Sequence, residues 1–222
     1  MAPRADRSRG LAQRLMRSTA VPLVYERWWR PTLGWVAKGG HGPTMAEEHD
    51  LAVSLLDLRH GQIVLDVACG TGAFTRGFAT AVGPDGTAIG LDRSRTMLAQ
   101  AVRQTSPDQS VVFLRADAER PPLRPGSVDA ICCFAALHLF DDAEAALSSF
   151  ASLLKPGGRV AVLTSARRTW LPLRLFDSGV GSLSGMRMFD RGEVAGLLRD
   201  REFTDVTERA DGVVQIVGAR RR

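Results

Sequence analysis

The chain has 222 residues, 45% of them hydrophobic and 24% charged, which is typical of a globular protein and excludes a disordered or collagen-like one. Its formal net charge is +5, but residues 1–40 alone carry a net charge of +6, so the remainder is nearly neutral. A basic arm on a neutral body argues against a nucleic-acid partner and leaves contact with an anionic membrane surface open. Without a secretory apolar block or an apolar run of ~18 residues, we expect a cytoplasmic protein with, at most, peripheral membrane contact.

Short apolar runs alternate with amphipathic segments from residue 61 onward. The pattern predicts buried parallel strands and intervening helices, followed by a last helix after the Asp190–Glu193 capping-box pair. A closing hairpin is predicted to turn at Asp211-Gly212. We therefore expect an α/β fold with a doubly wound, Rossmann-like and mostly parallel sheet. The predicted strands are 63–69, 87–92, 111–116, 128–134, 159–164, 203–210 and 213–219, and the predicted helices include 73–81, 94–104 and 141–154.

A glycine loop follows the first strand in the stretch VLDVACGTGAFT, residues 64–75. Gly70 and Gly72 leave room for a ligand to approach the backbone. The dinucleotide fingerprint requires a third glycine where Thr75 stands, and no Lys-Ser/Thr pair follows, which excludes a phosphate-binding P-loop. Cys69, inside the loop, fits a small packing residue better than a nucleophile. A two-glycine loop alone does not identify its ligand.

Three carboxylates narrow the choice of ligand. Asp92 ends the second predicted strand, where it can accept hydrogen bonds from a ribose diol, and Asp117 ends the third, where it can accept from an adenine amine. Asp66 lies just before the loop, an expensive place for a charge without a partner. Carboxylates at one sheet edge repel a diphosphate, so the sequence favours a cationic, adenosine-bearing ligand. Taken singly, Asp92 and Asp117 are equally compatible with capping their loops.

These residues resemble the class I S-adenosylmethionine-dependent methyltransferases, in particular the branch that includes ubiquinone and menaquinone biosynthesis. The matching stretches are VLDVACGTGAFT, GLDRSRTMLAQA, RADAERPPLRPGSVDAI, AALHLFDD and LLKPGGRVAVLT, which cover roughly residues 60–165 in order. The resemblance implies a seven-stranded sheet with an antiparallel last strand, S-adenosylmethionine as cofactor and S-adenosylhomocysteine as product. The cofactor-binding residues it implies are Asp66, Ala68, Gly70 and Gly72, Asp92 for the ribose, Asp117 and Ala118 for the adenine edge, Arg93 and Met97 around the adenine, and Phe134.

The acceptor side is expected after the fourth strand, in FAALH at residues 134–138. This stretch lacks the motifs of nucleobase amino-methyltransferases, RNA cytosine methyltransferases and metal-dependent catechol-type enzymes, which favours a metal-independent reaction on a small acceptor and predicts no metal site. His138 is the candidate catalytic base and also a substrate contact, because it can titrate near neutral pH. The alternative is a histidine that only packs on the cofactor or bonds a carbonyl.

Two segments are predicted to cover the site. Residues 1–45 are expected to form an N-terminal helical cap on a cofactor-binding domain at 46–222, with Tyr25 and Trp29 as substrate contacts. Residues 165–189 are expected to form a lid that contributes Trp170. Two apolar covers imply a hydrophobic acceptor such as a quinol, polyketide, aromatic compound or lipid, methylated on oxygen or carbon. The tryptophan-rich cap equally resembles a membrane-surface anchor or a helix packed on the sheet, and a homodimer is compatible with the pattern.

Other functions remain open on the sequence alone. A catalytically silent cofactor-binding protein that regulates or assembles a partner would have the same glycine loop and carboxylates. An RNA methyltransferase could use the basic arm and would bind RNA with a steep salt dependence. An NAD-linked oxidoreductase is disfavoured by the missing third glycine.

Overall fold

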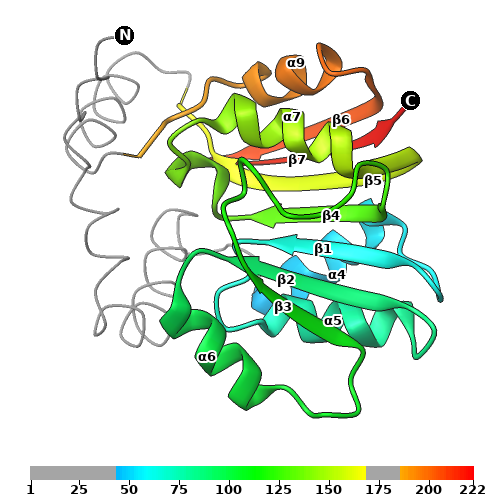
Figure 1. Cartoon of the computed structure of the whole chain (residues 1–222). Helices are drawn as coiled ribbons and strands as arrows, with labels where there is room; N and C mark the ends of the chain where they lie inside the picture. Colours follow the sequence, from blue (N-terminus) through cyan, green and yellow to red (C-terminus); the bar gives the residue numbers. More distant parts are fainter. Residues whose placement is uncertain (1–43, 169–185) are drawn as a thin grey trace, which may run out of the picture.

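A seven-stranded sheet forms the centre of the computed structural model, which describes residues 44–168 and 186–222 (Figure 1). The strand order is β3-β2-β1-β4-β5-β7-β6; strands β1 to β5 are parallel to one another, and β7 is antiparallel to β5 and β6. The predicted doubly wound sheet with an antiparallel last strand is therefore confirmed. The strands are β1 Ile63–Val67, β2 Thr87–Asp92, β3 Val111–Arg115, β4 Val128–Phe134, β5 Leu154–Ser165, β6 Phe203–Asp211 and β7 Val214–Arg221.

Helices cover both faces of this sheet, with α7 and α9 on the face toward the viewer in Figure 1 and α4 and α5 behind it. Helix α6 packs along β2 and β3 at the edge of the sheet. Each face has its own hydrophobic cluster, because the strands are buried on both sides. The helices are α4 Met45–Leu56, α5 Ala73–Val82, α6 Arg95–Gln104, α7 Ala143–Leu153 and α9 Glu193–Arg199, with a short 3-10 helix η2 at Leu137–Leu139.

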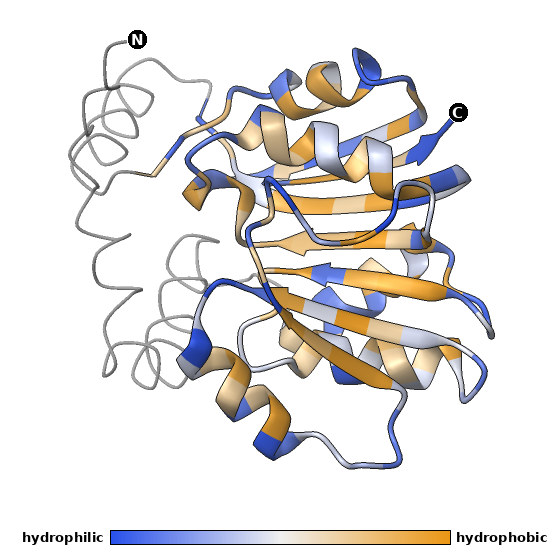
Figure 2. Ribbon diagram, in the orientation of Figure 1, coloured by the Kyte–Doolittle hydropathy of each residue, from blue (hydrophilic) through white to orange (hydrophobic). Residues whose placement is uncertain are grey.

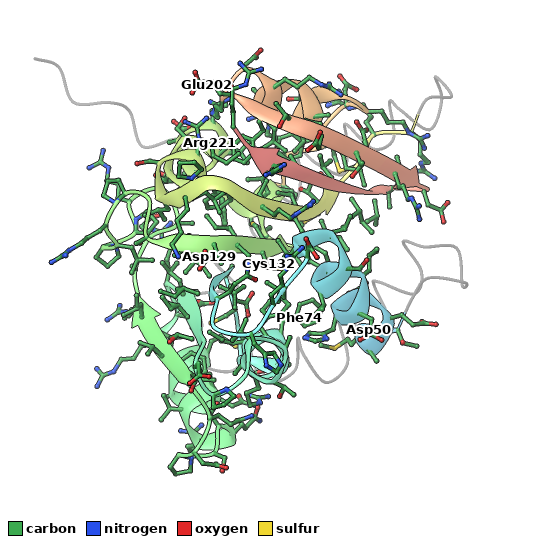
Figure 3. The ribbon with its side chains drawn as sticks, turned by 90° about the vertical axis from the view of Figure 1, so that its right-hand side faces the viewer. Asp50, Phe74, Asp129, Cys132, Glu202 and Arg221 are labelled. Atoms are coloured by element: carbon green, nitrogen blue, oxygen red, sulfur yellow. The ribbon has the colours of Figure 1, made fainter. Side chains whose placement is uncertain are left out.

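Strand β4 lies between β1 and β5, and its apolar side chains pack against both faces of the sheet (Figure 2). Cys132, labelled in Figure 3, packs in the cluster under α4 and α5, whereas Cys133 packs in the cluster under α7 and α9. The two cysteines therefore face opposite sides of the sheet, as predicted. Burial, followed by the charge of Asp66, raises the pKa of the Cys133 thiol, which keeps it protonated.

Two helix starts differ from the sequence expectation. Helix α4 was not predicted; it begins with a capping box in which Thr44 and Glu47 bond each other's backbone. Near the C-terminus the Glu193 side chain accepts the Asp190 N–H at 2.7 Å, as a capping box requires, but α9 begins only at Glu193. The reason is Gly192, which takes a left-handed conformation (φ 81°) as the N-cap.

No helix within the described residues is long and apolar enough to cross a membrane.

The close approach of β2 to β3 gives a test of the sheet packing. A Cβ on Gly90 would lie 2.7 Å from the Phe113 ring and 2.9 Å from the Cys69 sulfur, so Gly90→Ala should lower the free energy of unfolding by about 1–3 kcal/mol. Gly196→Ala in α9 is the matched control, because no atom lies within 4 Å of its added Cβ and alanine favours the helix by about 1 kcal/mol. Urea denaturation of both variants measures this. Equal effects of the two substitutions would contradict the packing described for Gly90.

Candidate functional site

A cavity of about 700 Å³ opens at the carboxyl ends of the parallel strands. Its lining comes from the segments that directly follow β1, β2, β3 and β4, where an open parallel sheet offers a ligand site. Nine of the ten residues predicted to bind the cofactor line it: Asp66, Ala68, Gly70, Asp92, Arg93, Met97, Asp117, Ala118 and Phe134.

Gly72 is the predicted cofactor residue that does not line the cavity. It is the N-cap of α5 with φ 76°, and a Cβ there would lie 2.8 Å from the Phe113 ring and 3.2 Å from the Ala101 methyl. Glycine is therefore required at this position by the packing of the loop on β3 and α6. The predicted substrate contacts Tyr25, Trp29 and Trp170 lie outside the described residues, as does most of the predicted lid.

Asp92 joins the ends of two strands through its carboxylate. Its Oδ2 accepts the Gly70 N–H at 2.9 Å and its Oδ1 accepts the Ser94 N–H at 2.7 Å. The Asp92 side chain also lines the cavity. The loop-capping interpretation of Asp92 and the ligand-binding one are thus compatible, and capping holds the carboxylate at the cavity wall.

Arg93 lies between two carboxylates on the cavity rim. One of its terminal nitrogens is 3.5 Å from Asp117 and 3.6 Å from Asp141, while Asp117 also accepts the Glu119 N–H at 3.1 Å. All three side chains of this ionic cluster are at least 40% exposed, so its contribution to stability is small, about 0–1 kcal/mol for each pair. Its effect is to fix the rim that follows β2, β3 and β4.

Asp66 is a buried carboxylate, with 4% of its surface exposed, on the cavity side of β1. Its Oδ2 accepts the Thr75 hydroxyl at 2.5 Å, a short charge-assisted hydrogen bond. Together with the acids already described, the lining holds five carboxylates and three guanidinium groups, the latter from Arg93, Arg95 and Arg115. This excess of negative charge suits a cationic ligand and disfavours a diphosphate.

The other half of the cavity is apolar. Phe74 from α5 and Phe134 from β4 stand with ring centroids 5.8 Å apart, and Leu139 and Phe140 extend this wall after η2. Phe74, labelled in Figure 3, also meets the His49 ring of α4 edge-on at 5.4 Å. The spacing of Phe74 and Phe78 in the sequence predicts only a helix over residues 73–81, and does not indicate that Phe74 reaches the cavity. The motif LHLFDD contains Phe140 and Asp141, but nothing in it indicates that both reach the cavity.

Two of the loops that form the cavity hold an alanine in the left-handed region. Ala68 after β1 has φ 58° and Ala135 after β4 has φ 56°, and both line the cavity. This conformation costs a non-glycine residue roughly 1–2 kcal/mol. Such a cost at the ends of two adjacent strands is typical of backbone shaped for a ligand.

His138 does not line the cavity, although its neighbour Leu139 in η2 does. Its Nδ1 lies 3.3 Å from the Thr164 hydroxyl of β5, and its carbonyl accepts the Arg187 N–H at 2.9 Å. Burial lowers the pKa of His138 to about 4, so the ring is neutral near pH 7.

Cys69 lines the cavity inside the glycine loop. Burial raises the pKa of its thiol, and the nearby charges of Asp66 and Asp92 raise it further. A thiol held in its protonated form is a poor nucleophile. The structure therefore supports Cys69 as a packing residue.

Comparisons with known proteins agree with this geometry. Residues 64–158 match the methyltransferase domain family. The chain is 30% identical over 220 residues to an uncharacterized chloroplastic methyltransferase of Arabidopsis thaliana, which covers 95% of this chain and 58% of the relative. It is 36% identical to the ubiquinone/menaquinone biosynthesis C-methyltransferase UbiE of Stutzerimonas stutzeri, over 53% of this chain and 47% of the relative. The chain thus spans about half the length of these curated relatives.

The fold is also found among solved structures. A SAM-dependent methyltransferase from Aquifex aeolicus superposes with a TM-score of 0.63 at 20% identity, covering 78% of this chain and 89% of that one.

The lowered pKa of the half-buried His138 ring leads to a prediction of how stability changes with pH. Because its pKa is about 4 in the fold and 6.5 ordinarily, the unfolded chain binds more protons between these values, and stability should fall as pH drops through this window. The loss should reach up to about 3 kcal/mol and should be absent in His138→Gln. Urea denaturation between pH 7 and 4.5 measures it, with His60→Gln at an exposed histidine as control. Parallel curves for wild type and His138→Gln would contradict the burial of the ring.

Proposed function

We infer that this chain, which belongs to the class I S-adenosylmethionine-dependent methyltransferases, binds S-adenosylmethionine in the described cavity and methylates a small hydrophobic acceptor. One observation carries the inference: a single cavity is lined both by a net-negative set of charged side chains beside Gly70 and by a set of aromatic side chains. The first suits a cationic adenosine ligand and the second suits an apolar molecule beside it. The family supplies the cofactor, and the lining residues fit it.

The strand order arranges the carboxylates along the sheet edge. Along neighbouring strands, Asp117 follows β3, Asp92 ends β2, Asp66 lies one residue before the end of β1, and Phe134 ends β4. The first three would accept from the adenine amine, the ribose hydroxyls and the ammonium group, in that order. When bound, S-adenosylmethionine supplies an electrophilic methyl group on a positively charged sulfur. The side chains of this edge orient the ligand and keep its cationic end beside Asp66.

Phe74, Phe134, Leu139 and Phe140 would hold the acceptor and exclude water from it. Fixing an acceptor against the cofactor can supply about 7–11 kcal/mol of the activation barrier without further chemistry. The relative from Stutzerimonas stutzeri is named for ubiquinone and menaquinone biosynthesis. We therefore propose a quinol-like aromatic acceptor, methylated on carbon, as the first candidate substrate.

His138 remains a proposal for the acceptor side. A base works best when its pKa lies near the working pH, and a pKa of about 4 makes the ring a weak acceptor for a proton. The ring does not line the cavity, and its Nδ1 lies against Thr164. An indirect role, in which His138 holds η2 and the cavity-lining Leu139 in place, therefore fits better than proton removal.

Cofactor binding can be tested directly. Asp92→Ala should weaken S-adenosylhomocysteine about tenfold or more in calorimetry, because it removes both the ribose acceptor and the bonds that hold Gly70 and Ser94. Asp85→Ala, at an exposed aspartate before β2, should bind as the wild type does. Unchanged affinity in Asp92→Ala would place the ligand elsewhere.

A methyl-transfer assay would identify the chemical class of the acceptor. Incubation with S-adenosylmethionine carrying a deuterated methyl group should label alkylated hydroquinones, and hydroquinones bearing a sulfonate should react far more slowly because the aromatic wall offers no partner for that charge. Mass spectrometry of the products gives the result. If S-adenosylhomocysteine binds but no acceptor in the panel or in cell extract is labelled, a regulatory cofactor-binding protein becomes the better account.

A further inference from the structure

Thr75 occupies the position at which dinucleotide-binding loops carry their third glycine. It lies in the first turn of α5, and none of its surface is exposed to solvent. Its hydroxyl donates to Asp66 Oδ2 at 2.5 Å. The departure from the glycine pattern thus places a buried donor against a buried carboxylate.

Asp66 is held on both sides by neighbouring strands, opposite Gly90 on β2 and Cys132 on β4. A carboxylate in such a place is costly unless donors reach it, and a donor that fixes one oxygen also fixes the plane of the other. Because Asp66 lines the cavity, the bond from Thr75 sets how this carboxylate meets a ligand.

We propose that Thr75 is a positioning residue that orients Asp66 toward the cationic amino-acid end of the cofactor. This inference rests on the proposed function. The strand order supports this proposal. Asp117 and Asp92 lie at the ends of β3 and β2, whereas Asp66 lies near the end of β1, beside the glycine loop and next to β4. The Thr75 hydroxyl bonds Asp66 and also lies beside the Cys69 side chain, and both belong to the part of the cavity wall around the end of β1, so we expect its effect to be confined to one end of the ligand.

A residue that only stabilises the fold would affect every ligand of the cavity equally. A residue that acts through Asp66 discriminates between ligands that have the amino-acid end and ligands that lack it. S-adenosylhomocysteine has this end, and 5′-methylthioadenosine has the same adenosine and thioether without it. The ratio of their affinities therefore separates the two roles.

Calorimetry with these two ligands on three threonine variants provides the test. Thr75→Val keeps the shape and removes the donor, so S-adenosylhomocysteine should weaken about tenfold or more while 5′-methylthioadenosine changes less than about twofold. Thr75→Ser keeps the donor and should restore S-adenosylhomocysteine to within about threefold of the wild type. Thr80→Val, at an exposed threonine of the same helix, is the matched control and should leave both affinities unchanged.

Asp66→Asn gives a second measurement that does not depend on the folding of Thr75→Val. It keeps an acceptor for the Thr75 hydroxyl but removes the charge, and should show the same selective loss of S-adenosylhomocysteine. Equal weakening of both ligands, or no weakening, in these variants would overturn the positioning role. If the wild type binds neither ligand, the proposed function fails first, and the positioning role fails with it.

Discussion

The site depends on the way Asp92 connects the ends of β1 and β2. One oxygen of its carboxylate accepts the Gly70 N–H and the other accepts the Ser94 N–H, at 2.9 and 2.7 Å. These bonds fix the glycine loop against the neighbouring strand and begin α6 at a defined place. Because both bonds are made by backbone amides, the loop conformation and the acid at the cavity wall form one unit.

Around this unit, the order of the parallel strands determines which side chains line each part of the cavity. Adjacent strands bring acids at β3, β2 and β1 and aromatic residues after β4, so polarity changes along one edge of the sheet. The left-handed alanines at 68 and 135 lie at the ends of β1 and β4, where this change occurs. The unfavourable backbone conformations therefore occur at the ends of β1 and β4, the same two strands at which the lining changes from acidic to aromatic.

Much of this could be predicted from the sequence, because period-two and continuous apolar runs specify strands and the residues that directly follow them. Asp66, Asp92 and Asp117 were placed at one edge on that basis alone. Gly72 shows the limit: the sequence indicates that a glycine is needed but not that Phe113 and Ala101 are the reason, since these contacts join distant segments. Thr75 was judged only by the glycine it replaces, because its partner Asp66 becomes its neighbour only when α5 folds back on β1.

His138 is expected from the sequence to titrate near neutral pH, whereas burial beside Thr164 lowers the pKa of its ring to about 4, and its role on the acceptor side stays a proposal. Phe140 and Asp141 were not assigned to the site for a related reason: the course of the chain through η2 decides which side chains reach the cavity. In both cases the deciding quantity is a tertiary environment, which no local pattern in the sequence encodes.

The central claim is that one cavity holds an adenosine cofactor at its acidic half and an apolar acceptor at its aromatic half. A crystal structure of the protein with S-adenosylhomocysteine tests it most directly. The account predicts ribose hydroxyls bonded to Asp92, the adenine beside Asp117, and the sulfur facing Phe74 and Phe134. Ligand density outside this cavity, or an adenine against the aromatic wall with the amino-acid end at Asp117, would contradict it.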